Sequence, residues 1–184
     1  MPCILDNGYN LGCNTTGGVK NVYLGTYDPE VTYDDTTDPD GIITLLVDNP
    51  NAVECYNFQQ DLEFAGLEQT GNFSQENGTV FYESVLSMKF IHLDANLRNL
   101  VNALGKAPIF AVIESNAGEY FLLGTESPGR ATEGVSSLGV AMGDMNGSTL
   151  SFTFKSENPA PLTVAGILNS GVADPTLITL TATT

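Results

Sequence analysis

The chain has few of the residues that perform chemistry or bind nucleic acid. Its 184 residues include no tryptophan, one histidine and three cysteines, and only six lysines and arginines against 22 acidic residues. The formal net charge of −16 argues against nucleic-acid recognition, because binding phosphates requires clustered lysine and arginine. No apolar run approaches the ~20 residues of a membrane-spanning helix, and no secretory signal peptide is visible. These absences leave a globular protein without membrane contact as the expectation.

The cysteines and the histidine form no recognisable site. Cys3, Cys13 and Cys55 are an odd number without C-x-x-C spacing, so we expect free thiols in a reducing cytoplasm and neither a disulfide framework nor a zinc site. No G-x-S-x-G motif accompanies His92, and nothing in the sequence places a nucleophile beside it. We expect His92 to be an ordinary residue at a strand-to-helix junction.

Other partial motifs also fall short of a functional site. The segment Thr36–Gly41 imitates a calcium loop, but Thr36 replaces the first aspartate and Val47 stands where the closing glutamate belongs. Gly17-Gly18 before Lys20 does not meet the phosphate-loop pattern. A glycosidase site would need aromatic side chains on which sugars stack, and the chain has no tryptophan. We therefore expect no catalytic, cofactor-binding or metal-binding residues, and a protein that is not an enzyme.

What the sequence does contain is a series of β-strand patterns joined by glycine turns. In the clearest stretch, Phe110–Pro161, Leu150, Phe152 and Phe154 alternate with polar residues, which is typical of a strand with one buried face. Asn146-Gly147 predicts a type I′ hairpin turn. Further strands are predicted at Val19–Tyr27, Ile42–Val47, Val53–Phe64, Thr79–Phe90, Ile109–Glu114, Tyr120–Leu123 and Leu177–Ala182, with turns at Asp34–Gly41, Phe73–Gly78 and Ala117-Gly118.

One helix stands out among these strands. Leu93–Leu104 carries leucine and valine at the spacing of one helix face. Asp94 is a suitable N-cap, Gly105 lies where a C-terminal cap belongs, and Pro108 prevents continuation. The fold class predicted is mainly β, an antiparallel sandwich or small barrel with one helix inserted between strands. We expect an N-terminal arm over residues 1–18, one domain over 19–160 and a C-terminal extension over 161–184.

The acidic residues are unevenly placed. No lysine or arginine occurs between Lys20 and Lys89. The acids in this gap are Asp28, Glu30, Asp34, Asp35, Asp38, Asp40, Asp48, Glu54, Asp61, Glu63, Glu68, Glu76 and Glu83. This stretch is either a solvated surface that keeps the protein soluble or a surface that repels a polyanion such as DNA, and charge alone does not decide between them.

Several short motifs resemble structural proteins of crAss-like and related tailed bacteriophages. The opening GCNTTGGVKNVYLGTY at Gly12–Tyr27 is similar to their N-termini, which have a cysteine, a glycine pair, a lysine and an aromatic strand. The matches in the later run are Gly118, Tyr120, Leu122, Leu123, Gly124, Gly139, Gly143, Asp144, Asn146, Gly147, Leu150, Phe152, Glu157, Pro159 and Ala160. Two features depart from the pattern: Ser148 replaces an expected aromatic residue, and the acidic loop Asp34–Asp40 has no counterpart.

The resemblance implies a tail-tube-like fold and a virion structural protein. Subunits of that family assemble into rings, usually of six or twelve copies, in a tail tube or neck below the portal. It implies homo-oligomers that contact neighbouring tail, neck and portal proteins, and an acidic lumen through which DNA passes without specific binding during ejection. The protein would be made in the host bacterial cytoplasm and act in the virion.

A second hypothesis is a β-sandwich recognition module that binds a receptor or decorates a capsid. Tyr27, Tyr33 and Tyr82 would supply its exposed aromatics, although tyrosine at strand positions more often packs in a sheet. An enzyme remains a third possibility only because β-sandwiches host catalytic sites on loops.

Overall fold

The computed structural model describes residues 16–33, 42–43, 46–47, 53–61, 63–170 and 178–181. The first half contains β1 (Val19–Thr26), β2 (Thr32–Tyr33), β3 (Leu46–Val47), β4 (Val53–Gln59), β5 (Ala65–Ser74), β6 (Thr79–Ile91) and α1 (Ala95–Leu104). The second half contains β7 (Ile109–Ser115), β8 (Tyr120–Leu123), β9 (Arg130–Ser137), β10 (Gly147–Ser156), β11 (Leu162–Thr163), the 3₁₀ helix η1 (Ala165–Ile167), β12 (Leu168–Ser170) and β13 (Ile178–Thr181).

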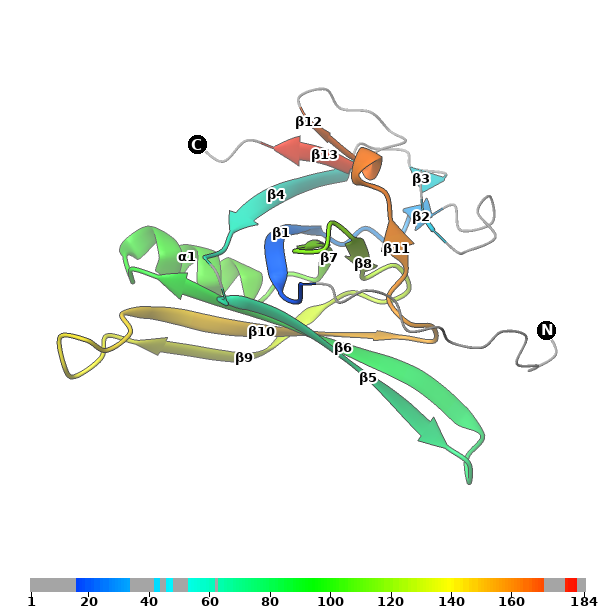
Figure 1. Cartoon of the computed structure of the whole chain (residues 1–184), viewed down its shortest axis with the longest axis horizontal. Helices are drawn as coiled ribbons and strands as arrows, with labels where there is room; N and C mark the ends of the chain where they lie inside the picture. Colours follow the sequence, from blue (N-terminus) through cyan, green and yellow to red (C-terminus); the bar gives the residue numbers. More distant parts are fainter. Residues whose placement is uncertain are drawn as a thin grey trace.

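The strands form two main sheets that face each other. A seven-stranded sheet has the order β11-β8-β7-β1-β4-β13-β12, a four-stranded sheet has the order β5-β6-β10-β9, and β2 pairs with β3. In Figure 1 the seven-stranded sheet curls above the four-stranded sheet, and the β5–β6 hairpin extends past both. The predicted class, mainly β and sandwich-like with one α-helix between strands, is confirmed.

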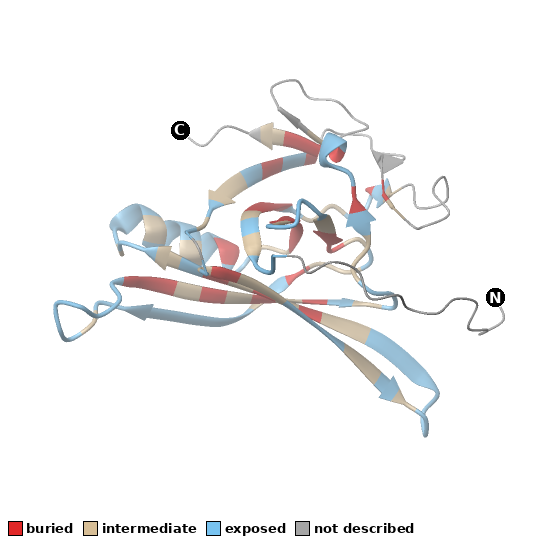
Figure 2. Cartoon of the chain, viewed as in Figure 1, coloured by how far each residue is buried: buried red, intermediate tan, exposed pale blue. Residues whose placement is uncertain are grey.

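Two hydrophobic cores lie on the two faces of the seven-stranded sheet. The core between the sheets contains Leu24, Leu86, Met88, Ile113 and Phe152, with Leu104 of α1. The core on the opposite face contains another set, Tyr23, Val31, Ile43, Val53, Cys55, Phe110, Val112, Leu122, Ile167 and Ile178. Buried residues therefore run continuously along β7, where Figure 2 shows red at the centre of the molecule.

Strands with clear apolar patterns form where the sequence predicts them. The predicted strands at Val19–Tyr27, Thr79–Phe90, Ile109–Glu114 and Tyr120–Leu123 correspond to β1, β6, β7 and β8 to within one residue at each end. In β10 the alternation is confirmed, because Leu150, Phe152 and Phe154 are buried while Ser151 is partly exposed. The described part of the last predicted strand is β13, and its pairing with β4 is parallel.

The helix begins two residues later than predicted. Asp94 is the N-cap, and its carboxylate accepts a hydrogen bond of 2.7 Å from the Leu97 N–H. Leu93 therefore precedes the helix, because the cap residue fixes the first turn. Gly105 is the C-cap but has right-handed backbone angles (φ −66°, ψ −17°), so its place does not depend on the freedom of glycine.

The region between β4 and β6 differs most from prediction. The strand predicted over Val53–Phe64 ends at Gln59, and Glu63 has a positive φ of 65° in the turn that follows. β5 was not predicted, and it includes Phe73 and Ser74 of the predicted turn Phe73–Gly78. The glycine and polar residues of this strand give it no strand pattern in the sequence, and pairing of its whole length with β6 stabilises it.

The predicted strand over Ile42–Val47 is also different in the described residues. Ile43 forms a single bridge with Thr163, whereas Leu46–Val47 is β3 and pairs with β2. The two ends of the segment thus pair with different partners.

The type I′ turn predicted at Asn146-Gly147 is wrong. The connection between β9 and β10 covers residues 138–146, and Gly147 is already the first residue of β10, opposite Ile91. A Cβ on Gly147 would lie 2.0 Å from the Phe90 carbonyl oxygen. The glycine is needed for close approach of two strands rather than for a turn.

Several expectations fall outside the described residues. These are the arm up to Thr15, with Cys3 and Cys13, the acidic loop Asp34–Gly41, and the calcium-like segment within it. Part of the predicted C-terminal extension is built into the fold, because β11, β12 and β13 belong to the same sheet as β1.

We predict that Gly147→Ala lowers the free energy of unfolding by about 3 kcal/mol, the cost of forcing a methyl group into a closed contact. Gly143→Ala is the matched control, because a Cβ at Gly143 meets nothing within 4 Å. Urea unfolding of both variants measures the difference. Equal stability of the two would contradict the strand contact at Gly147.

Candidate assembly surfaces

The four-stranded sheet has two free edges. β5 and β9 are its outer strands, and no described strand pairs with the far side of either one. Gly129, directly before β9, forms a single bridge with Ile109 of β7. Exposed edges present unpaired N–H and C=O groups that join readily to another strand. They are the first candidates for contact with another protein.

The strand pairing shows which groups of β5 point outward. The Lys89 N–H donates to the Phe64 carbonyl at 3.0 Å, so these opposed residues form a hydrogen-bonded pair. Hydrogen-bonded pairs alternate along an antiparallel ladder, so the N–H groups of Gly66 and Glu68 point to β6. Those of Leu67 and Gln69 point to the free edge.

Opposite charges lie on the two edges at the same level of the sheet. Glu68 of β5 is opposite Val85, Val85 is opposite Thr153, and Thr153 is opposite Arg130 of β9. These four side chains form one row across the face turned away from the core. If β5 of a second copy lay beside β9 without a shift along the strands, Glu68 of that copy would therefore lie level with Arg130.

The face of the sheet that carries this row is mostly polar and balanced in charge, with Phe81, Val85 and Val135 as apolar members. Figure 1 shows no described helix or strand packed on that side of the sheet. Threonine and serine hydroxyls occupy its centre in β10. The strand register places six charged side chains on it, Glu68, Glu83, Glu133, Lys89, Arg130 and Lys155. Of the described acids between Lys20 and Lys89, only Glu68 and Glu83 belong to this face.

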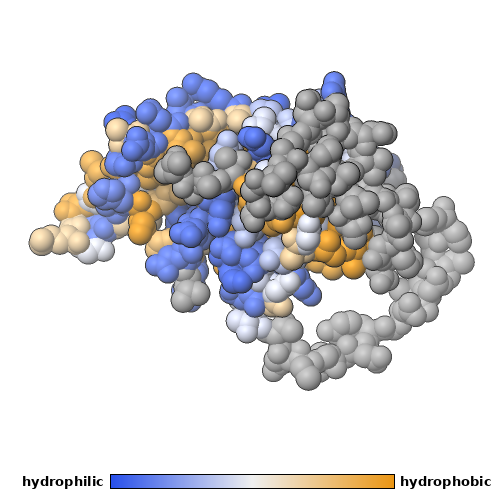
Figure 3. All heavy atoms as spheres, turned by 90° about the horizontal axis from the view of Figure 1, so that it is seen from above, coloured by the Kyte–Doolittle hydropathy of each residue, from blue (hydrophilic) through white to orange (hydrophobic). Residues whose placement is uncertain are grey.

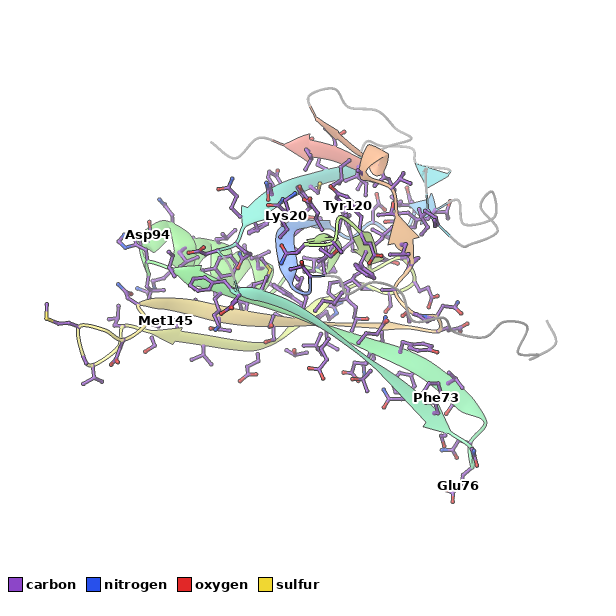
Figure 4. The ribbon with its side chains drawn as sticks, viewed as in Figure 1. Lys20, Phe73, Glu76, Asp94, Tyr120 and Met145 are labelled. Carbon is purple, nitrogen blue, oxygen red and sulfur yellow. The ribbon has the colours of Figure 1, made fainter. Side chains whose placement is uncertain are left out.

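The β5–β6 hairpin carries exposed apolar side chains beyond the body of the protein. Phe73 is 68% exposed and its ring meets Tyr82 edge-on, with centroids 6.0 Å apart. Val80 and Phe81 are also exposed. Figure 4 labels Phe73 and Glu76 at this end of the molecule.

A rigid loop at the other end also exposes apolar residues. The Asp144 carboxylate accepts hydrogen bonds of 2.8 Å from the N–H groups of both Val140 and Ala141, which lower the pKa of Asp144. Gly139 has a positive φ of 72°, and a Cβ there would lie 2.5 Å from the Asp144 Cβ. Val140 and Met142 are fully exposed on this closed loop.

Two of the hollows on the surface of the described part of the chain have apolar side chains in their lining. One, of about 520 Å³, lies between β4 and α1 and is lined mainly by apolar side chains such as Phe58, Phe90 and Leu104. The other, of about 610 Å³, is lined by residues of β2, β8, the end of β10 and the segment before β11. Seen from above, apolar surface remains uncovered between hydrophilic regions (Figure 3).

A buried carboxylate lies at the end of β7. Glu114 is buried and accepts hydrogen bonds from Lys20 Nζ at 2.5 Å and from Asn21 Nδ2 at 2.7 Å. A register shift between Val19 and Asn21 allows two consecutive residues of β1 to reach one carboxylate. Burial raises the pKa of Glu114, but the hydrogen bonds and the charge of Lys20 outweigh it, so the net pKa is lowered. Lys20 and Tyr120, which lies beside the same carboxylate, are labelled in Figure 4.

The residues singled out in the sequence are not brought together. His92 has a positive φ of 68° and donates its backbone N–H to Asn146, at the junction of β6 and α1. Cys55 is buried in the second core, and burial raises the pKa of its thiol to about 12. Tyr33 is partly buried and its pKa is raised for the same reason. Tyr82 packs on Phe73, and Tyr27 is partly exposed at the end of β1.

The described residues contain no group of three histidine, cysteine, aspartate or glutamate side chains placed to hold a metal ion. Within the same residues, no helix has the length and apolar character needed to cross a membrane. The arrangement is a β-sandwich with free sheet edges and exposed apolar projections. No protein-family model matches the chain, and no curated protein matches it either.

We predict that Glu114 makes stability depend on acid pH. Its folded pKa lies below its ordinary value, so its contribution is present at neutral pH and is lost as pH falls through the folded pKa. Glu114→Gln should cost about 1–2 kcal/mol at neutral pH and flatten the acid limb of a plot of unfolding midpoint against pH. Glu119→Gln, at an exposed position of the same region, is the control. An unchanged acid limb in Glu114→Gln would contradict the assignment.

Proposed function

We propose that the protein is a virion structural subunit that forms rings of a bacteriophage tail tube or neck, through which DNA passes on ejection. The observation that carries the proposal is the four-stranded sheet, whose outer strands β5 and β9 have no described strand beside them. Motif resemblance to tailed-phage structural proteins supports the same function.

Strand number and direction favour a closed ring. The four strands alternate in direction, because each of the three pairings is antiparallel. β5 and β9 therefore run in opposite directions, and β5 of one copy continues the antiparallel alternation when placed beside β9 of the next. Identical copies joined in this way form a heterologous contact, which closes into a ring when the rotation permits. Closure removes every free edge of the sheet.

The exposed face of this sheet would then line the bore. Its hydroxyls and balanced charges give no cationic track for phosphates, and the chain as a whole carries −16. Weak contact with passing DNA would follow from the lack of net positive charge on this face. A strongly acidic lining is not required.

The alternative is a receptor-binding or capsid-decoration module. The exposed aromatic side chains of the β5–β6 hairpin favour it, since solvent-exposed aromatics are common in recognition surfaces. This function requires a monomer or small oligomer that binds a glycan or a capsid surface.

Light scattering after gel filtration, with negative-stain images of the main peak, distinguishes these functions. Rings with an open bore support the tail or neck subunit. A monomer at every concentration and on co-expression with its neighbouring tail proteins contradicts it and favours the recognition module.

We predict that Gln69→Pro abolishes ring formation while the subunit stays folded. Proline removes an N–H that points to the free edge, and edge positions tolerate it. Gln69→Ala is the matched control, because it loses the same side-chain hydrogen bond to Ser84 (3.1 Å) but keeps the backbone N–H. Negative-stain images should show rings for Gln69→Ala only. Rings in both variants would rule out β5 as the joining edge.

A further inference from the structure

We propose that the loop 138–146 of one copy seats in the hollow beside the end of β10 of a second copy, and that this contact stacks rings end to end. The inference rests on the proposed function and deepens it, since it concerns contact along the bore axis and not contact around the ring.

The loop has the properties of a preformed apolar projection. Val140 and Met142 have relative exposures of 103% and 108%, so neither side chain is covered by the described residues of its own chain. The Asp144 carboxylate and Gly139 hold the loop closed, and the Gly139 N–H also donates to Ser137 Oγ at 3.1 Å. A loop fixed in this way loses little conformational freedom on binding.

The receiving hollow is large enough for both side chains. It has a volume of about 610 Å³, and its apolar lining includes Ile43, Leu122, Phe154, Pro159 and Leu162. Leu162 is 38% exposed, so apolar surface faces outward there. Polar groups of Thr125 and Asn158 are also among the lining residues, so backbone groups of an entering loop would find partners as well.

The loop and the hollow lie at opposite ends of one strand. The loop ends at Asn146, directly before β10 begins, whereas Phe154, Lys155 and Ser156 at the far end of β10 line the hollow. At ~3.4 Å per residue the two are roughly 25–30 Å apart, so the loop of a chain does not reach its own hollow. Complementary features at opposite ends of a molecule give a head-to-tail contact that repeats without closing.

The other hollow, the apolar groove between β4 and α1, cannot receive the loop when rings stack end to end. Gly147 pairs with Ile91, and Phe90 lines that groove, so groove and loop lie at the same end of the sheet. When rings stack in one orientation, the loop of one ring meets the opposite end of the next.

Disulfide trapping tests the contact directly. Met142→Cys and Ala160→Cys are introduced together in the full chain with Cys3 and Cys13 changed to serine, and assembled protein is oxidised. Because a disulfide requires Cα atoms within about 7 Å, any bond between these positions joins two copies. We expect a ladder of linked multimers in non-reducing electrophoresis and none from either single cysteine. A ladder from Met142→Cys with Leu100→Cys, in place of the Ala160 pair, would assign the loop to the groove and overturn the proposal.

A second measurement separates this contact from ring formation. Val140→Asp with Met142→Asp should give single rings that do not stack, with association along the axis weakened roughly 10- to 100-fold for each buried side chain lost. Met142→Leu, which keeps the apolar contact, should stack normally. Stacks of unchanged length in the double aspartate variant would overturn the inference while the ring proposal stands. A wild-type chain that forms no rings would overturn both.

Discussion

Burial of β7 on both faces is the constraint on which the rest of the fold depends. Ile109, Ala111 and Ile113 face the core between the sheets, and Phe110 and Val112 face the opposite core. A strand buried on both sides requires a layer on each side. The four-stranded sheet and α1 supply one layer. On the other side, η1, the segment around Val31 and the curled end of the same sheet at β13 supply the cover. The inner face of the four-stranded sheet is therefore buried in the core. Its outer face and its edges are left for contact with other molecules.

Polar and apolar side chains occupy different parts of the remaining surface. Along the outer face of the four-stranded sheet, hydroxyl groups and equal numbers of acidic and basic side chains predominate. Large exposed apolar side chains instead gather at its two ends, in the β5–β6 hairpin and in the loop 138–146. In the proposed rings, neighbouring subunits would meet through backbone groups at the sheet edges and through apolar side chains at the sheet ends. These are two contacts of different chemistry, which mutations can separate.

The sequence predicted correctly those helices and strands that form because of interactions between residues close together in the chain. The alternation in β10 and the Asp94 cap and apolar spacing of α1 reflect burial and capping that neighbouring residues determine. β5 was missed because Gly66, Gly71 and its polar residues have low strand propensity, and the long ladder with β6 supplies its stability. Gly147 was misread because a strand contact and a tight turn both require glycine. The free edges depend on strand order, and the exposure of Val140 and Met142 depends on tertiary packing, so neither is visible in the sequence.

The parallel pairing of β13 with β4 has a consequence for the timing of folding. Residues 178–181 hydrogen-bond to residues 53–56, so the two strands are synthesised far apart in time. Until the later strand emerges from the ribosome, the edge of β4 is unpaired and Val53 and Cys55 lack the cover of Ile178. Such long-range pairing slows folding and leaves an aggregation-prone edge exposed until the later strand pairs with it. Chaperone dependence during translation would therefore concentrate on this edge, at the opposite side of the sheet from β8 and β11.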